Sequence, residues 1–100
     1  MPGAFSLHLT ASARATLEQL ERDAGLAKRL NAVRKTLARL ESNPRHPGLQ
    51  SHKFQSLVGP NGEDVFEAYA EQSTSAAYRV FWCYGPEKGQ ITIVAITPHP

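Results

Sequence analysis

The sequence predicts an α+β protein: an N-terminal strand and a two-helix hairpin packed on one face of an antiparallel three- to four-stranded sheet. Two stretches in the first half have apolar residues at helical spacing. Residues 78–84 and 90–96 are rich in β-branched and aromatic residues, and they flank a stretch with two glycines and a proline, as in a hairpin. The length of 100 residues fits one domain spanning residues 1–100.

Residues 5–10 alternate apolar and polar side chains, which predicts a strand with one buried face and places His8 at the surface or at an edge. A helix follows. Thr10 or Ser12 caps it, because either hydroxyl can accept from the free backbone N–H groups of a first turn. Gly25 ends it, and we expect a left-handed backbone there.

A second helix begins at Leu26 and ends before Pro44, since proline disfavours helical geometry in the residue preceding it. Its apolar residues recur at alternating spacings of four and three. The stripe covers barely two heptads, which favours a core-facing helix over a coiled coil. The stripe consists of Leu26, Leu30, Val33, Leu37 and Leu40.

The rest of the chain predicts strands. Residues 49–58 alternate weakly and are typical of an edge strand, and the Gly-Pro-Asn-Gly sequence at 59–62 is a turn. Residues 65–71 alternate clearly. Both parities of 78–84 and 90–96 are largely apolar, so we expect these two strands inside the sheet with cover on each face.

Arg79 is the one charge in those two apolar runs. A buried cation needs an anion or a water-filled hollow, because stranding it costs several kcal/mol. One interpretation is a structural ion pair with Glu67 or Glu71; another is a phosphate site, since a guanidinium presents a planar fork of donors. We expect the open face of the sheet to carry Arg79, Glu67, Tyr69, His52 and Lys53.

The net charge of +2 is unevenly spread: residues 1–50 hold eight Lys and Arg against four Asp and Glu. Residues 28–45 hold six basic residues and one acidic residue. This run is either a solvated helix face or a surface for an acidic partner or nucleic acid.

No apolar run approaches the ~20 residues of a membrane span, no secretory signal is visible, and the lone Cys83 cannot form an internal disulfide. These features predict a cytoplasmic protein without membrane association. In the apolar run, Cys83 is expected to be a small buried hydrophobe.

The four histidines lack the short spacing of metal ligands, and the sequence has no glycine-rich phosphate loop, so we expect neither a metal nor another cofactor. His99 follows the last strand and stands between two prolines. It is either a frayed terminal residue or an imidazole held over the sheet for proton transfer.

The chain resembles the RelE/ParE superfamily of toxins from bacterial type II toxin–antitoxin modules, and within it the RelE/YoeB branch. The resemblance implies a ribosome-dependent endoribonuclease that cuts messenger RNA and inhibits translation. Besides the order of elements, it depends on Pro44, Pro47 and Leu49 after the second helix, on Tyr78-Arg79-Val80, and on Ile93-Val94-Ala95-Ile96.

By this resemblance, Arg79 matches the arginine that contacts the scissile phosphate, and His99 falls at the catalytic histidine of the YoeB branch. Other positions depart from the pattern. Glu67 and Tyr69 stand where RelE has two lysines, and residues 47–51 hold no carboxylate where YoeB has its general base.

The implied reaction is attack of a 2′-hydroxyl on the adjacent phosphate. Our hypothesis is that Glu67 serves as the base from the sheet, with Arg79 and Lys53 as the charge clamp and His99 as acid or base. His52 and Tyr69 would contact the substrate.

Two alternatives stay open. The chain could be a non-enzymatic binder of the same fold, acting on gyrase as the ParE branch does or only pairing with an antitoxin. It could also be a structural module in which Arg79 merely pairs with Glu67. The partners implied by the resemblance are an antitoxin, the ribosome and messenger RNA, with a homodimer as a further assembly.

Overall fold

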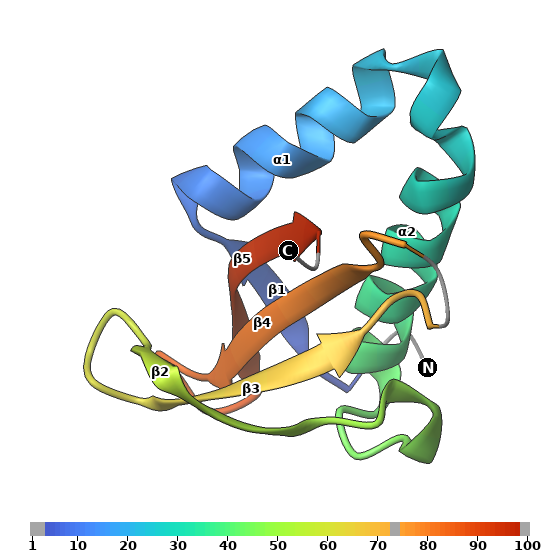
Figure 1. Ribbon diagram of the computed structural model, residues 1–100. Coiled ribbons are helices and arrows are strands. Elements are labelled where there is room, and N and C mark those ends of the chain that lie inside the picture. The colour runs from blue at the N-terminus through green and yellow to red at the C-terminus, as the bar shows by residue number, and fades with distance from the viewer. Residues whose placement is uncertain (1–3, 73–74, 99–100) are drawn as a thin grey trace.

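The computed structural model describes residues 4–72 and 75–98 (Figure 1). Its five strands form one sheet in the order β1-β5-β4-β3-β2. Two helices follow β1, as predicted. The elements are β1 (Ser6–Leu9), α1 (Ala11–Arg22), α2 (Ala27–Ser42), β2 (His52–Val58), β3 (Asp64–Tyr69), β4 (Tyr78–Tyr84) and β5 (Gln90–Pro98).

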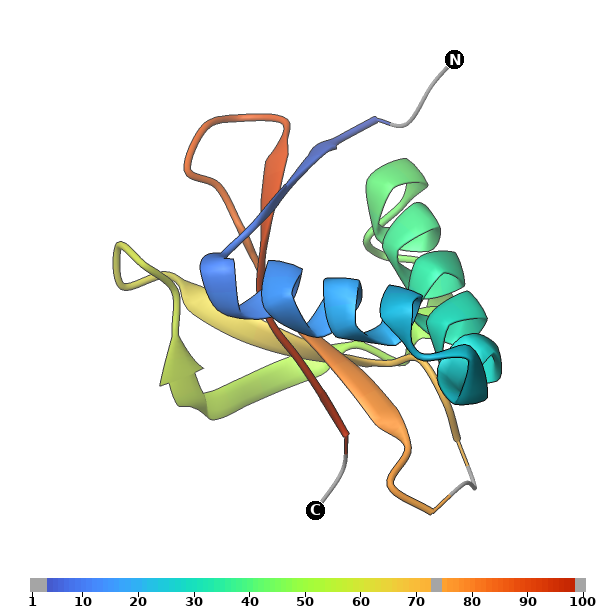
Figure 2. The same ribbon diagram turned by 90° about the horizontal axis from the view of Figure 1, so that it is seen from above.

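The predicted α+β class is confirmed: α1 and α2 meet at an angle and cover one face of a mostly antiparallel sheet (Figures 1 and 2). The sheet has one strand more than the largest predicted number, because β1 joins its edge. There β1 runs parallel to β5, with Leu7 opposite Ile91. A parallel neighbour needs a long connection, and residues 10–89 supply it.

The main core lies between the helices and the sheet. Leu20 of α1, Leu40 of α2, Trp82 of β4 and Ile93 of β5 are all fully buried in it. As predicted, β4 and β5 lie inside the sheet, each with a hydrogen-bonded strand on both sides. A smaller cluster on the other face contains Val65, Phe81 and Cys83, with Phe54 packed against it.

The first helix is capped by Thr10, whose hydroxyl accepts a hydrogen bond from the Ala13 backbone N–H at 3.1 Å. The predicted end of this helix is wrong. Gly25 lies in a 3-10 turn, Ala24–Leu26, and does not have a positive φ. The helix ends at Arg22 instead, and at the capping residue Asp23 the backbone is extended and the carboxylate accepts from the Gly25 N–H at 2.9 Å.

The weakly alternating stretch at 49–58 is an edge strand, as predicted, but it begins only at His52. The residues before it form a 3-10 turn at Pro47–Leu49 followed by Gln50 in a left-handed conformation. Gly62, in the predicted turn at 59–62, has a φ of 84°. No helix within the described part of the chain is long and apolar enough to cross a membrane.

Candidate functional site

Polar side chains of three neighbouring strands meet on the sheet face away from the helices. Glu67 of β3 lies opposite His52 of β2 and opposite Phe81 of β4, and Tyr69 lies opposite Arg79. Residues opposite one another, or two apart on one strand, share a face of a sheet. The alternate residues of β3 and β4 pack into the helix-covered core, so this polar set points the other way.

The Glu67 carboxylate is the centre of this cluster. Its Oε2 accepts a hydrogen bond from Arg79 Nη1 at 2.6 Å, and its Oε1 lies 2.7 Å from His52 Nε2. The Tyr69 hydroxyl donates to Oε1 at 3.4 Å. One carboxylate therefore joins a guanidinium, an imidazole and a phenol, and we call these four residues the Glu67 cluster.

Burial makes these contacts strong. The Glu67 side chain is 4% exposed and that of Arg79 is 14% exposed, whereas that of His52 is 50% exposed. Hydrogen bonds between charged groups offset much of the cost of removing a carboxylate from water. Both Glu67 oxygens are occupied, so Glu67 is suited to hold its neighbours in place, and His52 is the member with an accessible imidazole.

Arg79 keeps hydrogen-bonding capacity beyond its ion pair. Its guanidinium lies over the Phe81 ring, 5.0 Å from the ring centroid. Its Nε is buried and has no hydrogen-bond partner among the described residues. A guanidinium has five N–H donors, and an unpaired buried donor is costly. One buried donor of Arg79 therefore lacks an acceptor among the described residues.

The sequence left two ion-pair partners open for Arg79, and the structure selects Glu67. Glu71 instead lies 3.1 Å from Arg29 and accepts a hydrogen bond from the Tyr78 backbone N–H at 3.0 Å. The ion pair expected of a purely structural Arg79 is therefore present, together with two polar neighbours that this interpretation did not include.

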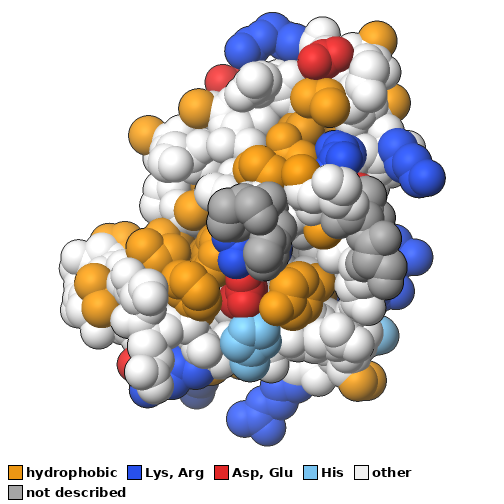
Figure 3. Space-filling model, viewed as in Figure 1, with side chains coloured by type: hydrophobic (Ala, Val, Ile, Leu, Met, Phe, Trp, Pro, Cys, Tyr) orange, Lys and Arg blue, Asp and Glu red, His pale blue; other side chains and the backbone are white. Residues whose placement is uncertain are grey.

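Arg79, Glu67, His52 and Tyr69, four of the six predicted site residues, come together. Lys53 does not join them. It lies opposite Phe66, on the other parity of β2, and its Nζ is 3.4 Å from Asp64. His99, the sixth, lies outside the described residues. In Figure 3, acidic, basic and histidine side chains gather near the centre of the face in view.

The described residues contain no group of three or more His, Cys, Asp or Glu side chains placed to hold a metal ion.

The basic residues at 28–45 are partly engaged in contacts within the molecule. Arg29 donates to the backbone oxygens of Ser75 and Ala76, and Arg34 pairs with Glu21 at 3.0 Å.

No protein-family model matches the sequence, and no curated protein does. Solved structures do match. A YoeB/ParE toxin from Agrobacterium tumefaciens aligns over 96% of this chain and 100% of its own, with a TM-score of 0.70 and 11% identity. The chain has the fold of the RelE/YoeB-type toxins.

Two further structures share this toxin fold. The RelE-RelB complex from Pyrococcus horikoshii OT3 aligns over 95% of this chain and 94% of the matched chain, with a TM-score of 0.64 and 17% identity. The YoeB dimer from Staphylococcus aureus aligns over 97% and 99%, with a TM-score of 0.64 and 10% identity. The resemblance inferred from short motifs is therefore confirmed in the fold, and the chemistry must be argued from the site.

Proposed function

We propose that the protein is a RelE-type toxin that cleaves messenger RNA on the ribosome. One observation carries the proposal: a single buried carboxylate holds a guanidinium and a half-exposed imidazole together on the sheet face that the helices leave open. RNA cleavage needs a positive group that binds the phosphate and a group that can exchange protons near neutral pH. The RelE/YoeB fold supports the same conclusion.

In the proposed reaction, the ribose 2′-hydroxyl attacks the adjacent phosphorus and the bond from phosphorus to the 5′-oxygen breaks. His52 accepts the hydroxyl proton through Nδ1, because its Nε2 is engaged by Glu67 at 2.7 Å, whereas Nδ1 has only a long contact of 3.4 Å with the Gln50 backbone oxygen. Arg79 stabilises the charge that develops on the phosphate oxygens. The leaving oxygen takes a proton from an acid, for which we propose His99 on the basis of its sequence position.

His52 is thus the proposed base, in place of Glu67, which we expected to be the base from the sequence. Glu67 becomes a positioning residue, because its oxygens already accept from Arg79 and from its other neighbours. Tyr69 is left to contact the substrate, and its ring centroid is 5.7 Å from that of His52. Lys53 lies apart from the Glu67 cluster on the edge strand β2, and we still predict that it contacts RNA.

The partners follow from the proposed activity. We propose the ribosome and messenger RNA as targets in the cytoplasm, and a cognate antitoxin protein as the inhibitor. The neighbour solved as a RelE-RelB complex supports an antitoxin, and the neighbour solved as a YoeB dimer supports a homodimer.

The test is a cleavage assay with purified protein, programmed ribosomes and a defined messenger, read by primer extension. The parent should cut the messenger, and Arg79→Ala should reduce the rate by about 10²-fold or more. Arg14→Ala, an exposed arginine on α1, should leave the rate unchanged. Thermal unfolding shows whether each variant is folded. An intact messenger with the parent protein rejects the proposal.

A non-enzymatic binder of the same fold is the second candidate, because Glu67 already neutralises Arg79 at 2.6 Å. Such a protein would act by binding a gyrase-type target or by pairing with an antitoxin. In that case His52→Ala would leave growth arrest on induction in a bacterium unchanged, whereas the cleavage proposal requires arrest to be lost.

A further inference from the structure

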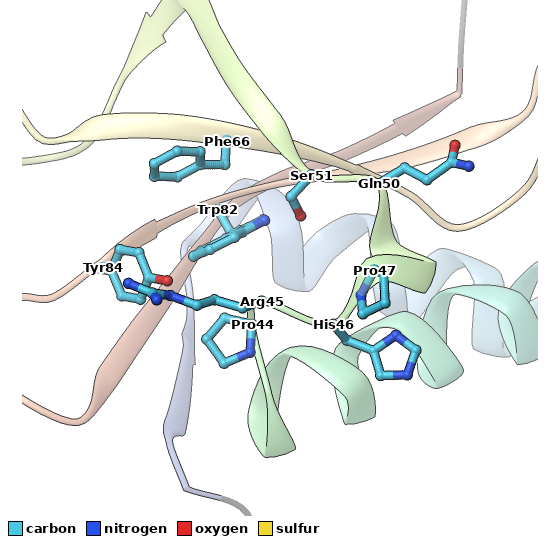
Figure 4. Close-up of a pocket in the computed structure, with 9 residues that line it drawn as sticks. All are labelled: Pro44, Arg45, His46, Pro47, Gln50, Ser51, Phe66, Trp82 and Tyr84. Atoms are coloured by element: carbon cyan, nitrogen blue, oxygen red, sulfur yellow. The ribbon is translucent and has the colours of Figure 1, made fainter.

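A pocket of about 410 Å³ opens on the other side of the sheet from the Glu67 cluster (Figure 4). Phe66, Trp82 and Tyr84 of β3 and β4 form one wall, and Pro44 and Pro47 belong to the opposing segment after α2. Concave apolar surfaces of this size are typical of binding sites. The proposed cleavage chemistry does not use this pocket.

Two buried polar atoms of the pocket lining have no hydrogen-bond partner among the described residues: Trp82 Nε1 and Ser51 Oγ. In Figure 4 the nitrogen of the Trp82 ring points toward the Ser51 side of the pocket. A buried donor without an acceptor costs about 1–3 kcal/mol. A bound group with a carbonyl oxygen would satisfy the indole N–H.

One arginine, Arg45, stands among the residues that line the pocket. Arg45 is exposed and extends toward Tyr84 in Figure 4, and none of the described side chains that line the pocket is acidic. Lys28, Lys35 and Arg39 recur at spacings of seven and four along α2, so they follow one side of the helix that leads to this segment. This charge complements an acidic partner.

The pocket suits a peptide better than a nucleobase. Trp82 is only 2% exposed, and its ring packs 5.0 Å from the rings of both Phe66 and Tyr84. It therefore offers no free face on which a base could stack. An apolar side chain with its own backbone carbonyl matches both the apolar wall and the unpaired indole donor.

We propose that this pocket binds an acidic peptide segment of a partner protein. One large apolar side chain of the segment packs against Phe66 and Tyr84, and a backbone carbonyl accepts from Trp82 Nε1. Carboxylates beside that anchor pair with Arg45. The pocket itself is independent of RNA cleavage, and only the identification of the partner as an antitoxin rests on the proposed function.

The experiment uses the single tryptophan as its probe. Nitrogen-15-labelled full-length protein gives one indole N–H signal, which is followed by NMR during titration. The first peptide is a capped hexapeptide with Leu-Phe between pairs of acidic residues. In the second peptide lysines replace the acidic residues, and in the third Gly-Gly replaces Leu-Phe. Adenosine monophosphate is the fourth ligand.

We expect the acidic Leu-Phe peptide to shift the indole signal saturably and to bind about tenfold more tightly than the lysine or Gly-Gly peptide. Arg45→Glu should weaken it about tenfold, whereas Arg14→Glu, the same charge change on α1, should not. The proposal is overturned if no peptide moves the signal, if adenosine monophosphate moves it instead, or if Arg45→Glu has no effect. Ribosomes are absent, so this outcome is independent of the cleavage test.

Discussion

The Arg79 guanidinium reaches the Glu67 carboxylate diagonally across two strands, and the two side chains meet at 2.6 Å. The residue directly opposite Arg79 is Tyr69, and the residue opposite Glu67 is Phe81. The Arg79 side chain therefore extends along β4, over the Phe81 ring, to reach the Glu67 carboxylate. The Phe81 ring makes a cation–π contact with the guanidinium, and the Glu67 carboxylate fixes the direction of the guanidinium N–H donors.

Glu67→Gln should destabilise the protein by about 3 kcal/mol, because it leaves Arg79 as a largely buried charge without an anion. The measurement is equilibrium unfolding in urea at neutral pH. The matched control is Glu21→Gln, which breaks the ion pair with Arg34 at the surface and should cost less than about 1 kcal/mol. Equal costs for the two variants would show that the Glu67 pair contributes no more than a surface pair.

His52→Gln should reduce the rate of messenger cleavage by about 10²-fold or more, because glutamine cannot accept the hydroxyl proton. Its effect on stability should be small, since half of the His52 side chain is exposed. Single-turnover cleavage measures the chemical step. His8→Gln, on the exposed edge strand β1, is the control and should cleave at the parent rate. A His52→Gln variant that cleaves normally would remove His52 from the reaction.

Element types and the placing of the helices on one face could be predicted because the hydrophobic periods of α1, α2 and β3 are local and distinct. The pairing of β1 with β5 could not be predicted. Its partner β5 lies more than 80 residues along the chain, and four alternating residues specify neither edge nor direction. The end of α1 was missed for a different reason: the Asp23 side chain supplies a turn that Gly25 was expected to supply.

The Glu67 cluster was partly predictable, because Glu67, Tyr69 and Arg79 occupy matching parities on two adjacent strands. Which of His52 and Lys53 would join the cluster could not be predicted. These neighbours point to opposite faces, and which one meets Glu67 depends on where β2 begins after the 3-10 turn. The Trp82 indole N–H, which has no hydrogen-bond partner among the described residues, has no sequence signal.

Thr10→Ala should destabilise the protein by about 1–2 kcal/mol, whereas Ser12→Ala should change it by less than about 0.5 kcal/mol. The sequence allowed either residue to cap α1. In the structure Thr10 accepts from the Ala13 N–H at 3.1 Å and also donates to the Val94 oxygen of β5 at 2.8 Å. Ser12 is exposed. Thermal and urea unfolding measure both variants, and a larger loss for Ser12→Ala would contradict this assignment of the cap.

The stability of the protein should fall as the pH rises above about 9, and Cys83→Ala should reduce that fall. Burial raises the pKa of the Cys83 thiol in the native state, and the nearby negative charge of Glu63 raises this pKa further. As the pH rises, the exposed thiol of the unfolded chain loses its proton first, so the unfolded state binds fewer protons than the native state. The free energy of unfolding then declines by at most about 1.4 kcal/mol per pH unit from this group. Urea unfolding between about pH 7.5 and 10 under reducing conditions measures the decline, and equal slopes for the parent and Cys83→Ala would show that the thiol titrates alike in both states.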